Sequence, residues 1–112
     1  MPSPTVVHEQ DRPEQTYPLH QDLRVREVLG SGTGTGGGVA VYVAHVPPGA
    51  GVAVTQHDVD ETVHIAAGTA RLPDGTDLGA GTWVHLPAGT PHGLTNPGPG
   101  TLRLELLIHA PR

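Results

Sequence analysis

Proline and glycine interrupt this chain so often that a long helix is excluded. Twelve prolines and sixteen glycines are spread over 112 residues. Proline removes a backbone hydrogen-bond donor, and glycine is unfavourable in the interior of a helix or strand. The segments between these breaks are short and almost without helical periodicity. Short strands joined by frequent turns are typical of sandwiches and barrels, so the sequence predicts an all-β fold.

Alternation of apolar and polar residues locates the strands of this fold. We expect them at residues 22–29, 38–46, 52–57, 61–67, 70–72, 82–86, 92–95 and 101–109. Turns rich in proline and glycine separate them, as at Pro73-Asp74-Gly75. Since no helix is expected between the strands, the pattern favours a jelly-roll β-barrel of two antiparallel sheets. We expect residues 22–112 to form this single barrel domain and the polar residues 1–21 to form an extended N-terminal arm.

The composition argues against nucleic-acid and membrane partners and limits the kinds of metal ligand that the chain can supply. The net charge is −5 and the six basic residues are scattered singly, so no basic stripe is available to bind nucleic acid. No apolar run approaches the roughly 20 residues that cross a bilayer, and the N-terminus lacks the features of a signal peptide. We therefore expect a cytoplasmic protein with no membrane partner. Cysteine is absent while eight histidines are present, so any bound metal must be held by nitrogen and oxygen ligands.

Side-chain alternation also separates the outer faces of the strands from the inner faces. Trp83 and His85 alternate with two aliphatic residues that better suit the interior, so we expect both on the surface or at a dimer interface. Within 38–46, Tyr42 opposes a face of three valines and is expected to be exposed or at an interface. His45 is in phase with those valines. It either ends its strand in solvent or points toward a site as a general base.

Three residues combine by their spacing into a candidate metal site. His57 and Glu61 flank the tight turn Asp58-Val59-Asp60, and a turn of this length lets an imidazole and a carboxylate reach one coordination sphere. His92 opens a later strand just after the rigid corner 87–91. Two imidazoles and one carboxylate on one face of a metal ion suit Fe(II) and leave positions open for substrate or oxygen.

The same residues lie in motifs that resemble those of the cupin superfamily, particularly its small single-domain members. The second cupin motif, G-x5-P-x-G-x2-H-x3-N, is met at Gly81, Pro87, Gly89, His92 and Asn96. The first motif, G-x5-H-x-H-x3–4-E-x6-G, is met at Gly49, His57, Glu61 and Gly68, with Thr55 in place of its first histidine. The resemblance spans about residues 38–109.

This resemblance implies a homodimer and a metal centre in the barrel. His57, Glu61 and His92 would bind one divalent transition metal, Fe, Zn, Mn or Ni, and would form the catalytic centre. Thr55 lies two residues before His57, so alternation places both side chains on one face. A hydroxyl is a poor ligand for such ions, so a water or an open position replaces the missing imidazole. Glu61 is either the anionic ligand or a general base with its carboxylate off the metal.

The expected function is that of a metal-dependent enzyme acting on a small organic metabolite, with a specialised biosynthetic pathway as one setting. Dioxygenase, isomerase, cyclase and decarboxylase chemistry all fit a metal that binds substrate oxygens, acts as a Lewis acid or activates dioxygen. The alternative is a non-catalytic cupin that binds or senses a small molecule, because Thr55 leaves the ligand set incomplete.

Overall fold

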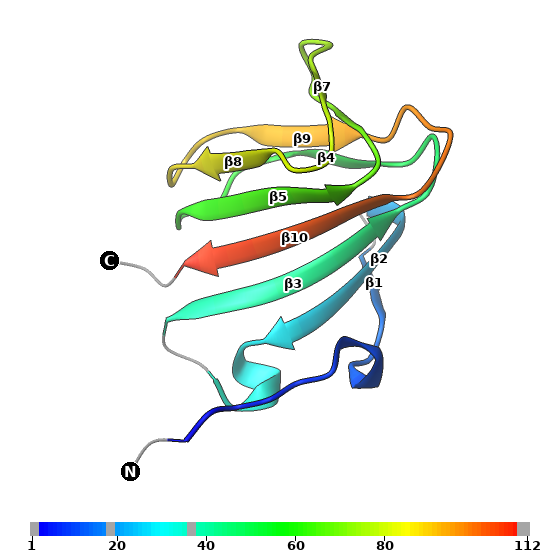
Figure 1. Cartoon of the computed structure of the whole chain (residues 1–112). Helices are drawn as coiled ribbons and strands as arrows, with labels where there is room; N and C mark the ends of the chain where they lie inside the picture. The colour runs from blue at the N-terminus through cyan, green and yellow to red at the C-terminus, as the bar shows by residue number, and fades with distance from the viewer. Residues whose placement is uncertain (1–2, 18–19, 36–37, 110–112) are drawn as a thin grey trace.

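Two antiparallel sheets face each other in the computed structural model, which describes residues 3–17, 20–35 and 38–109 (Figure 1). The larger sheet has the order β1-β2-β3-β10-β5-β8 and the smaller the order β4-β9-β6-β7. The strands are β1 (Gln15–Tyr17), β2 (His20–Leu29), β3 (Val39–Val46), β4 (Gly51–Thr55), β5 (Glu61–Ala67), β6 (Ala70–Arg71), β7 (Asp77–Leu78), β8 (Trp83–Leu86), β9 (His92–Thr95) and β10 (Leu102–His109). The predicted all-β jelly roll is confirmed. Within the described ranges, no helix has the length and hydropathy needed to cross a membrane.

Strand boundaries follow the alternation pattern closely over most of the chain. β1 and the first residues of β2 lie within the range expected to form an extended arm, and β4 and β7 also differ from the expectation. β4 ends at Thr55, so His57 lies in the loop after this strand rather than within it. The strand β7 was not expected, because two residues are too few to show alternation. It forms through a tight turn in which the Thr76 backbone N–H donates to Asp74 Oδ1 at 2.9 Å. This short hairpin projects from the body of the molecule (Figure 1).

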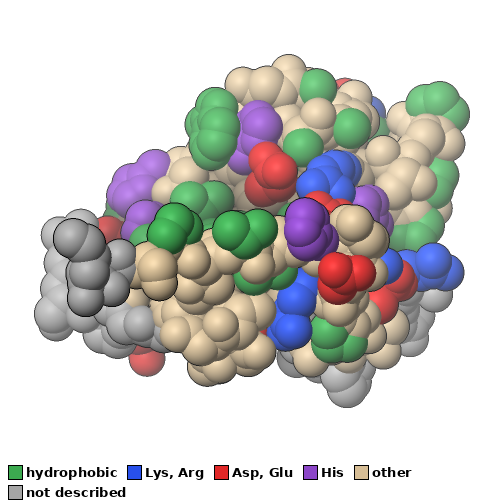
Figure 2. Space-filling model, turned by 60° about the horizontal axis from the view of Figure 1, so that its bottom comes forward, with side chains coloured by type: hydrophobic (Ala, Val, Ile, Leu, Met, Phe, Trp, Pro, Cys, Tyr) green, Lys and Arg blue, Asp and Glu red, His purple; other side chains and the backbone are tan. Residues whose placement is uncertain are grey.

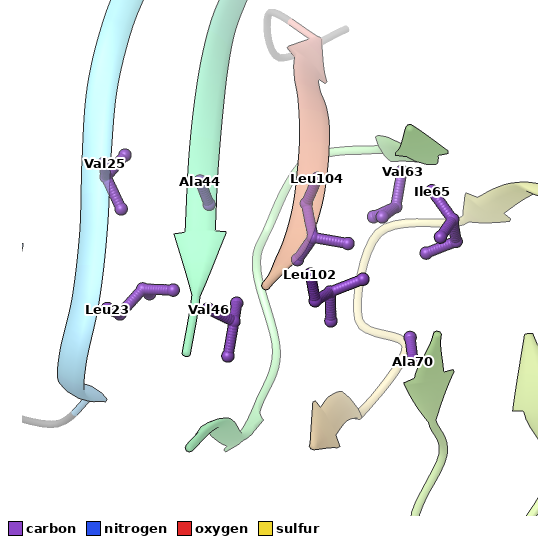
Figure 3. Close-up of a cluster of buried hydrophobic side chains, with 9 residues drawn as sticks. All are labelled: Leu23, Val25, Ala44, Val46, Val63, Ile65, Ala70, Leu102 and Leu104. Carbon is purple, nitrogen blue, oxygen red and sulfur yellow. The ribbon is translucent and has the colours of Figure 1, made fainter. Parts of the chain in front are cut away.

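Aliphatic side chains from both sheets fill the space between them (Figure 3). The β5 residues Glu61, Val63 and Ile65 are buried while their neighbours are half-buried, which is the two-residue period of a strand with one inner face. β10 contributes Leu102 and Leu104, which are almost fully buried. Each buried aliphatic side chain of this size stabilises the fold by about 1.5–3 kcal/mol relative to exposure.

The inner face of β3 is the opposite of the one expected. Tyr42 and Ala44 line the interior, whereas Val43 lies on the outer face. Val43 is nevertheless only 4% exposed, and it lies between Glu105 and Arg26 on the two neighbouring strands. The prediction that Tyr42 is exposed or at an interface is therefore wrong.

The arm is held to this outer face by ion pairs. The Arg103 guanidinium donates two hydrogen bonds to Glu9, at 2.7 and 2.9 Å, and Arg26 lies 4.0 Å from the same carboxylate. The hydrogen bond from Arg103 holds the pKa of Glu9 below its ordinary value. His45 also lies here, 3.3 Å from Arg103, so it points away from the interior. Acidic, arginine and histidine side chains lie next to one another on the face seen in Figure 2.

Candidate metal centre

A cavity of about 390 Å³ lies between the two sheets. Its wall is mainly aliphatic, with side chains from strands of both sheets, as the sequence predicts for the interior. Val84 and Leu86 belong to this wall, which leaves Trp83 and His85 on the outer face. The polar side chains in the described lining are few and mostly gathered in one place: Tyr42, Thr55, His57, Glu61 and His92. A mostly apolar cavity with a few convergent polar groups is typical of small-molecule sites.

Glu61 is the buried acid of this cavity. It begins β5 and pairs with Leu86 on one side and Ile108 on the other, so aliphatic neighbours surround it. Only 5% of the residue is exposed. No described group makes a hydrogen bond to its Oε2 atom, although that atom is inaccessible to solvent. A buried carboxylate oxygen without a hydrogen bond is costly unless a cation compensates it.

His92 supplies the nearest partner of that oxygen. Its Nε2 lies 3.0 Å from Glu61 Oε2, but the contact lacks the geometry of a hydrogen bond. On the other side of the ring, Nδ1 lies 3.0 Å from the Thr90 carbonyl oxygen. A carbonyl only accepts, so Nδ1 carries a proton. In the neutral tautomer with this proton, Nε2 presents a lone pair toward Glu61, and a cation between the nitrogen and the carboxylate oxygen would satisfy both.

His57 completes the group from the loop after β4. Its ring centroid lies 5.2 Å from that of His92, with the rings tilted by 47°. One ligand atom from each of His57, Glu61 and His92 lies within 4.8 Å of the others. The structure thus brings together the three residues that the sequence predicts as a metal site. His57 is the exposed member of the three, and it lies where the cavity opens to solvent.

Backbone hydrogen bonds tie the loop of His57 to the corner before His92. The Gly89 N–H donates to the His57 carbonyl oxygen at 2.7 Å. Gly89 has a positive φ of 83°, a conformation that favours glycine. In the same corner, the Ala88 N–H donates to Asp60 Oδ1 at 2.9 Å. The two segments that carry the imidazoles are therefore positioned together, although 35 residues separate them in sequence (92 − 57).

Thr55 lines the cavity, as the alternation with His57 predicts. It is half-buried and lies opposite His92 where β4 pairs with β9. Because residue 55 is a threonine and not a histidine, β4 presents only a small hydroxyl beside His57, Glu61 and His92. This is the side from which a ligand can approach the three residues.

The remaining histidines in strands lie elsewhere. His64 stacks on Trp83 with centroids 3.9 Å apart, and its Nδ1 lies 2.6 Å from Glu105. These residues occupy the outer face of the larger sheet, as does His45. The suggestion that His45 acts as a general base at the site is therefore wrong.

Tyr42 is the cavity residue that the sequence analysis misplaced. The three valines of β3 suggested that its other face was exposed. Ala44 and Val46 are in phase with Tyr42 and both are fully buried in the structure, but both faces of this strand are apolar, so the sequence held no signal that decides between them. The Tyr42 hydroxyl donates to Glu27 Oε2 at 3.3 Å.

The sequence of residues 42–109 matches the family model described as Cupin domain. Among solved structures, the chain is similar to the polyketide cyclase RemF from Streptomyces resistomycificus, with 19% identity, a TM-score of 0.81, and coverage of 96% of this chain and 80% of that one. A predicted oxalate decarboxylase from Thermotoga maritima gives 17% identity and a TM-score of 0.77, with coverage of 93% and 97%. At these identities the similarity establishes the fold alone.

A third similar structure is that of Rhodobacter sphaeroides SigE in complex with the anti-sigma ChrR. It gives 17% identity and a TM-score of 0.72, and it covers 90% of this chain and 51% of the matched one. Among curated proteins, no sequence matches the chain. Proteins of this fold therefore include enzymes and a chain of an anti-sigma complex. The fold alone does not indicate a function, which has to be inferred from the residues of the site.

Proposed function

Because this chain belongs to the cupin family, we propose that it is a metal-dependent cupin enzyme acting on a small organic metabolite, with His57, Glu61 and His92 as the metal ligands. The reaction classes that fit are those of cyclases, isomerases, decarboxylases and dioxygenases. Solved structures of the same fold include a polyketide cyclase and a predicted oxalate decarboxylase.

One observation carries this proposal: the 3.0 Å approach of Glu61 Oε2 to His92 Nε2. In the neutral ring, the bond from Nδ1 to Thr90 leaves Nε2 as an acceptor, and Oε2 has no hydrogen-bond partner in the described part of the chain. An ion between them would satisfy both atoms and balance the buried negative charge. Outer hydrogen bonds of this kind orient metal-binding imidazoles in proteins. The donor set of two nitrogens and one carboxylate fits Fe, Zn, Mn or Ni.

The chemistry follows from what surrounds the three ligands. A bound divalent ion would supply a Lewis acid for oxygen atoms of the substrate. The aliphatic wall excludes water and strengthens electrostatic interactions inside the cavity. Glu61 either holds the ion or accepts a proton from the substrate at its carboxylate. Thr55 leaves room beside His92 for a substrate to enter.

A second candidate function is a non-catalytic cupin that binds or senses a small molecule. Thr55 favours it, because a ligand set with one imidazole fewer binds metal less tightly. The similarity to a chain in the SigE–ChrR complex adds a precedent for a cupin fold outside metabolism. Under this alternative the cavity would take its ligand in the same way without turnover.

Elemental analysis after incubation with each ion separates the two functions. We expect close to one ion per chain in the wild type and none in His92→Ala, with a similar melting temperature for the metal-free proteins, because His92 is not part of the buried apolar core. His85→Ala is the matched control, since this histidine is exposed on the outer face. Wild-type protein that stays metal-free with every ion would contradict the enzyme proposal.

We also propose that two copies of the chain pair as a homodimer through the outer face of the larger sheet. Trp83 supports this, because it is 62% exposed and its ring stacks on His64. Sedimentation velocity tests the proposal: the wild type should run as a dimer and Trp83→Ser should shift toward the monomer. A monomeric wild type at all concentrations would contradict it.

A further inference from the structure

The ligand-binding polar groups of the cavity are gathered at one end of it. Thr55 ends β4, while Glu61 and His92 begin β5 and β9. His57 follows Thr55 in the loop after β4, and its ligand atom lies within 4.8 Å of those of Glu61 and His92. A ligand in the cavity therefore meets charged and hydrogen-bonding groups where the cavity opens to solvent.

Away from this end, the wall is aliphatic on both sheets. Along β5, the inner-face residues after Glu61 are Val63 and Ile65, and four residues of a strand span about 13 Å. On the facing sheet, Leu94 of β9 lies opposite Val52 of β4. All four aliphatic residues line the cavity. This part of the cavity therefore offers mainly hydrocarbon surface.

Tyr42 is the remaining polar residue of the described lining. Its hydroxyl donates to Glu27 Oε2 at 3.3 Å, and Glu27 is not among the lining residues. Tyr42 also packs against the buried aliphatic cluster. It therefore adds carbon surface to the wall.

The described lining holds no arginine, and the chain contains no lysine. Each of the five arginines in the described ranges lies within 4.0 Å of an acidic residue that is outside the lining. These pairs are Arg12 with Glu27, Arg24 and Arg26 with Glu14, Arg71 with Asp77, and Arg103 with Glu9. A phosphate, sulfonate or second carboxylate of a ligand would therefore be buried against this wall without a positive partner, which is costly.

The charge of the metal site limits the other end of the ligand. Imidazoles bind metals in their neutral form, so a divalent ion held by His57, His92 and the Glu61 carboxylate would keep one net positive charge. One ionised oxygen of a ligand balances that charge. The cavity thus suits one anionic oxygen at its polar end and no charge elsewhere.

We propose that the substrate is a largely hydrocarbon molecule whose oxygen functions are confined to the end that meets His57, Glu61 and His92. This inference rests on the proposed function and names its substrate class. The cavity volume of about 390 Å³ is near the lower end of the range for small-molecule sites, which suits one ring or two fused rings. Small dicarboxylates and phosphorylated sugars do not meet this description, because they carry charge or hydroxyl groups along their whole length.

Calorimetry with three probes and the zinc-loaded protein tests this inference. The first probe, 2,3-dihydroxynaphthalene, has two adjacent hydroxyls on one edge and a bare ring on the other. Its 6-sulfonate carries a charge on the far ring, and its 6-tert-butyl derivative carries an uncharged group of similar size there. We expect the diol and the tert-butyl derivative to bind within about tenfold of each other and the sulfonate to bind about 100-fold or more weakly than the diol, because its charge loses water without gaining a partner.

Leu106→Arg supplies the missing partner. Leu106 lines the cavity and lies opposite Val63 on β5. In this variant we expect the sulfonate to gain about tenfold or more in affinity relative to the diol, since an arginine can pair with it. Leu107→Arg is the matched control, because Leu107 is the next residue and lies opposite Thr62 on the outer face. Melting curves establish that both variants fold, and the three probes with the wild type decide the question if Leu106→Arg does not.

A sulfonate that binds the wild type as tightly as the diol would overturn the inference, as would a tert-butyl derivative that is weakened as much as the sulfonate. A folded Leu106→Arg with the probe preference of Leu107→Arg would also contradict it. Elemental analysis and a repeat with metal-free protein separate these results from a failure of the proposed function. A protein that takes up no metal but still prefers the diol to the sulfonate refutes the metal-dependent enzyme and leaves the requirement for an uncharged body standing. Full metal occupancy without that preference refutes the substrate class and leaves the metal site standing.

Discussion

Thr55 lies directly opposite His92 across the antiparallel pairing of β4 with β9. Its hydroxyl therefore occupies the strand position from which a further imidazole would reach the same metal ion. The side chain is half-buried and lines the cavity, so a larger residue there would project toward the three predicted ligands.

We expect Thr55→His to tighten metal binding by about tenfold or more, since even residues that only support a metal ligand are worth 10- to 100-fold in affinity. Competition with a chromogenic chelator measures the change. Val54→His is the matched control, because Val54 is the preceding residue and is 62% exposed on the other face of β4. Equal tightening in both variants would mean that a surface histidine, and not the site, is responsible.

Glu61→Gln separates the two roles proposed for the buried carboxylate. The amide of glutamine can donate to His92 Nε2, so the metal-free variant should melt at or above the temperature of metal-free wild type. The gain in melting temperature on adding metal should shrink, because the anionic ligand is gone. Loss of both metal and turnover identifies a ligand, whereas retained metal with lost turnover identifies a general base. Glu105→Gln, on the outer face, should keep the metal-dependent gain.

Replacing Asn96 by Ala should lower the stability of the fold and leave the metal site in place. The side chain is 2% exposed and donates to the carbonyl oxygens of Val46 and Gly100, both at 2.8 Å, while its Oδ1 accepts from Gly98 N–H at 2.8 Å. Asn96→Ala removes one buried hydrogen bond, to the Val46 carbonyl, and two part-buried ones, at a cost of about 3 kcal/mol in the free energy of unfolding. Urea denaturation of the metal-free protein measures it. The exposed neighbour Thr95, changed to Ala, should cost far less.

The N-terminal arm should detach in acid. Hydrogen bonding to Arg103 holds the pKa of Glu9 below its ordinary value of 4.5, so the docked arm stabilises the ionised carboxylate. This contribution is complete above pH 4.5 and is lost as the pH falls through the lowered pKa of the docked state. The protection factors of residues 3–14 in hydrogen exchange, which correct for the intrinsic pH dependence of amide exchange, should therefore fall at low pH in the wild type.

Glu9→Gln should show the low protection already at neutral pH, and high salt should act in the same direction because the pair is partly exposed. Glu14 is the control acid: it is more exposed than Glu9 and contacts Arg24 and Arg26 at 3.6 and 3.3 Å. Protection in Glu9→Gln that still depends on pH as in the wild type would show that another group holds the arm.

Alternation along single strands was enough to predict much of this molecule. The order Glu61, Val63, Ile65 places a carboxylate in phase with two aliphatic residues, and a strand can bury such a set on one face only. The spacing of His57 and Glu61 across a short turn likewise brings their side chains together within a local segment. These features depend on neighbours in sequence, which is why the all-β fold and the proximity of His57 to Glu61 could be inferred without the structure, whereas His92 was grouped with them through its position in the second cupin motif.

The face of β3 and the contacts around His92 depended on the tertiary structure. β3 is apolar on both faces, so alternation could not say that Tyr42 faces the cavity. In the structure Tyr42 lies on the inner face, and on the outer face of the same sheet Glu9 bonds to Arg103, 94 residues away in sequence. The approach of His92 Nε2 to Glu61 is likewise set by how the two sheets pack, because the residues lie on strands that do not pair with each other. Such contacts arise from burial between distant segments, and no local pattern in the sequence records which distant segment will be the partner.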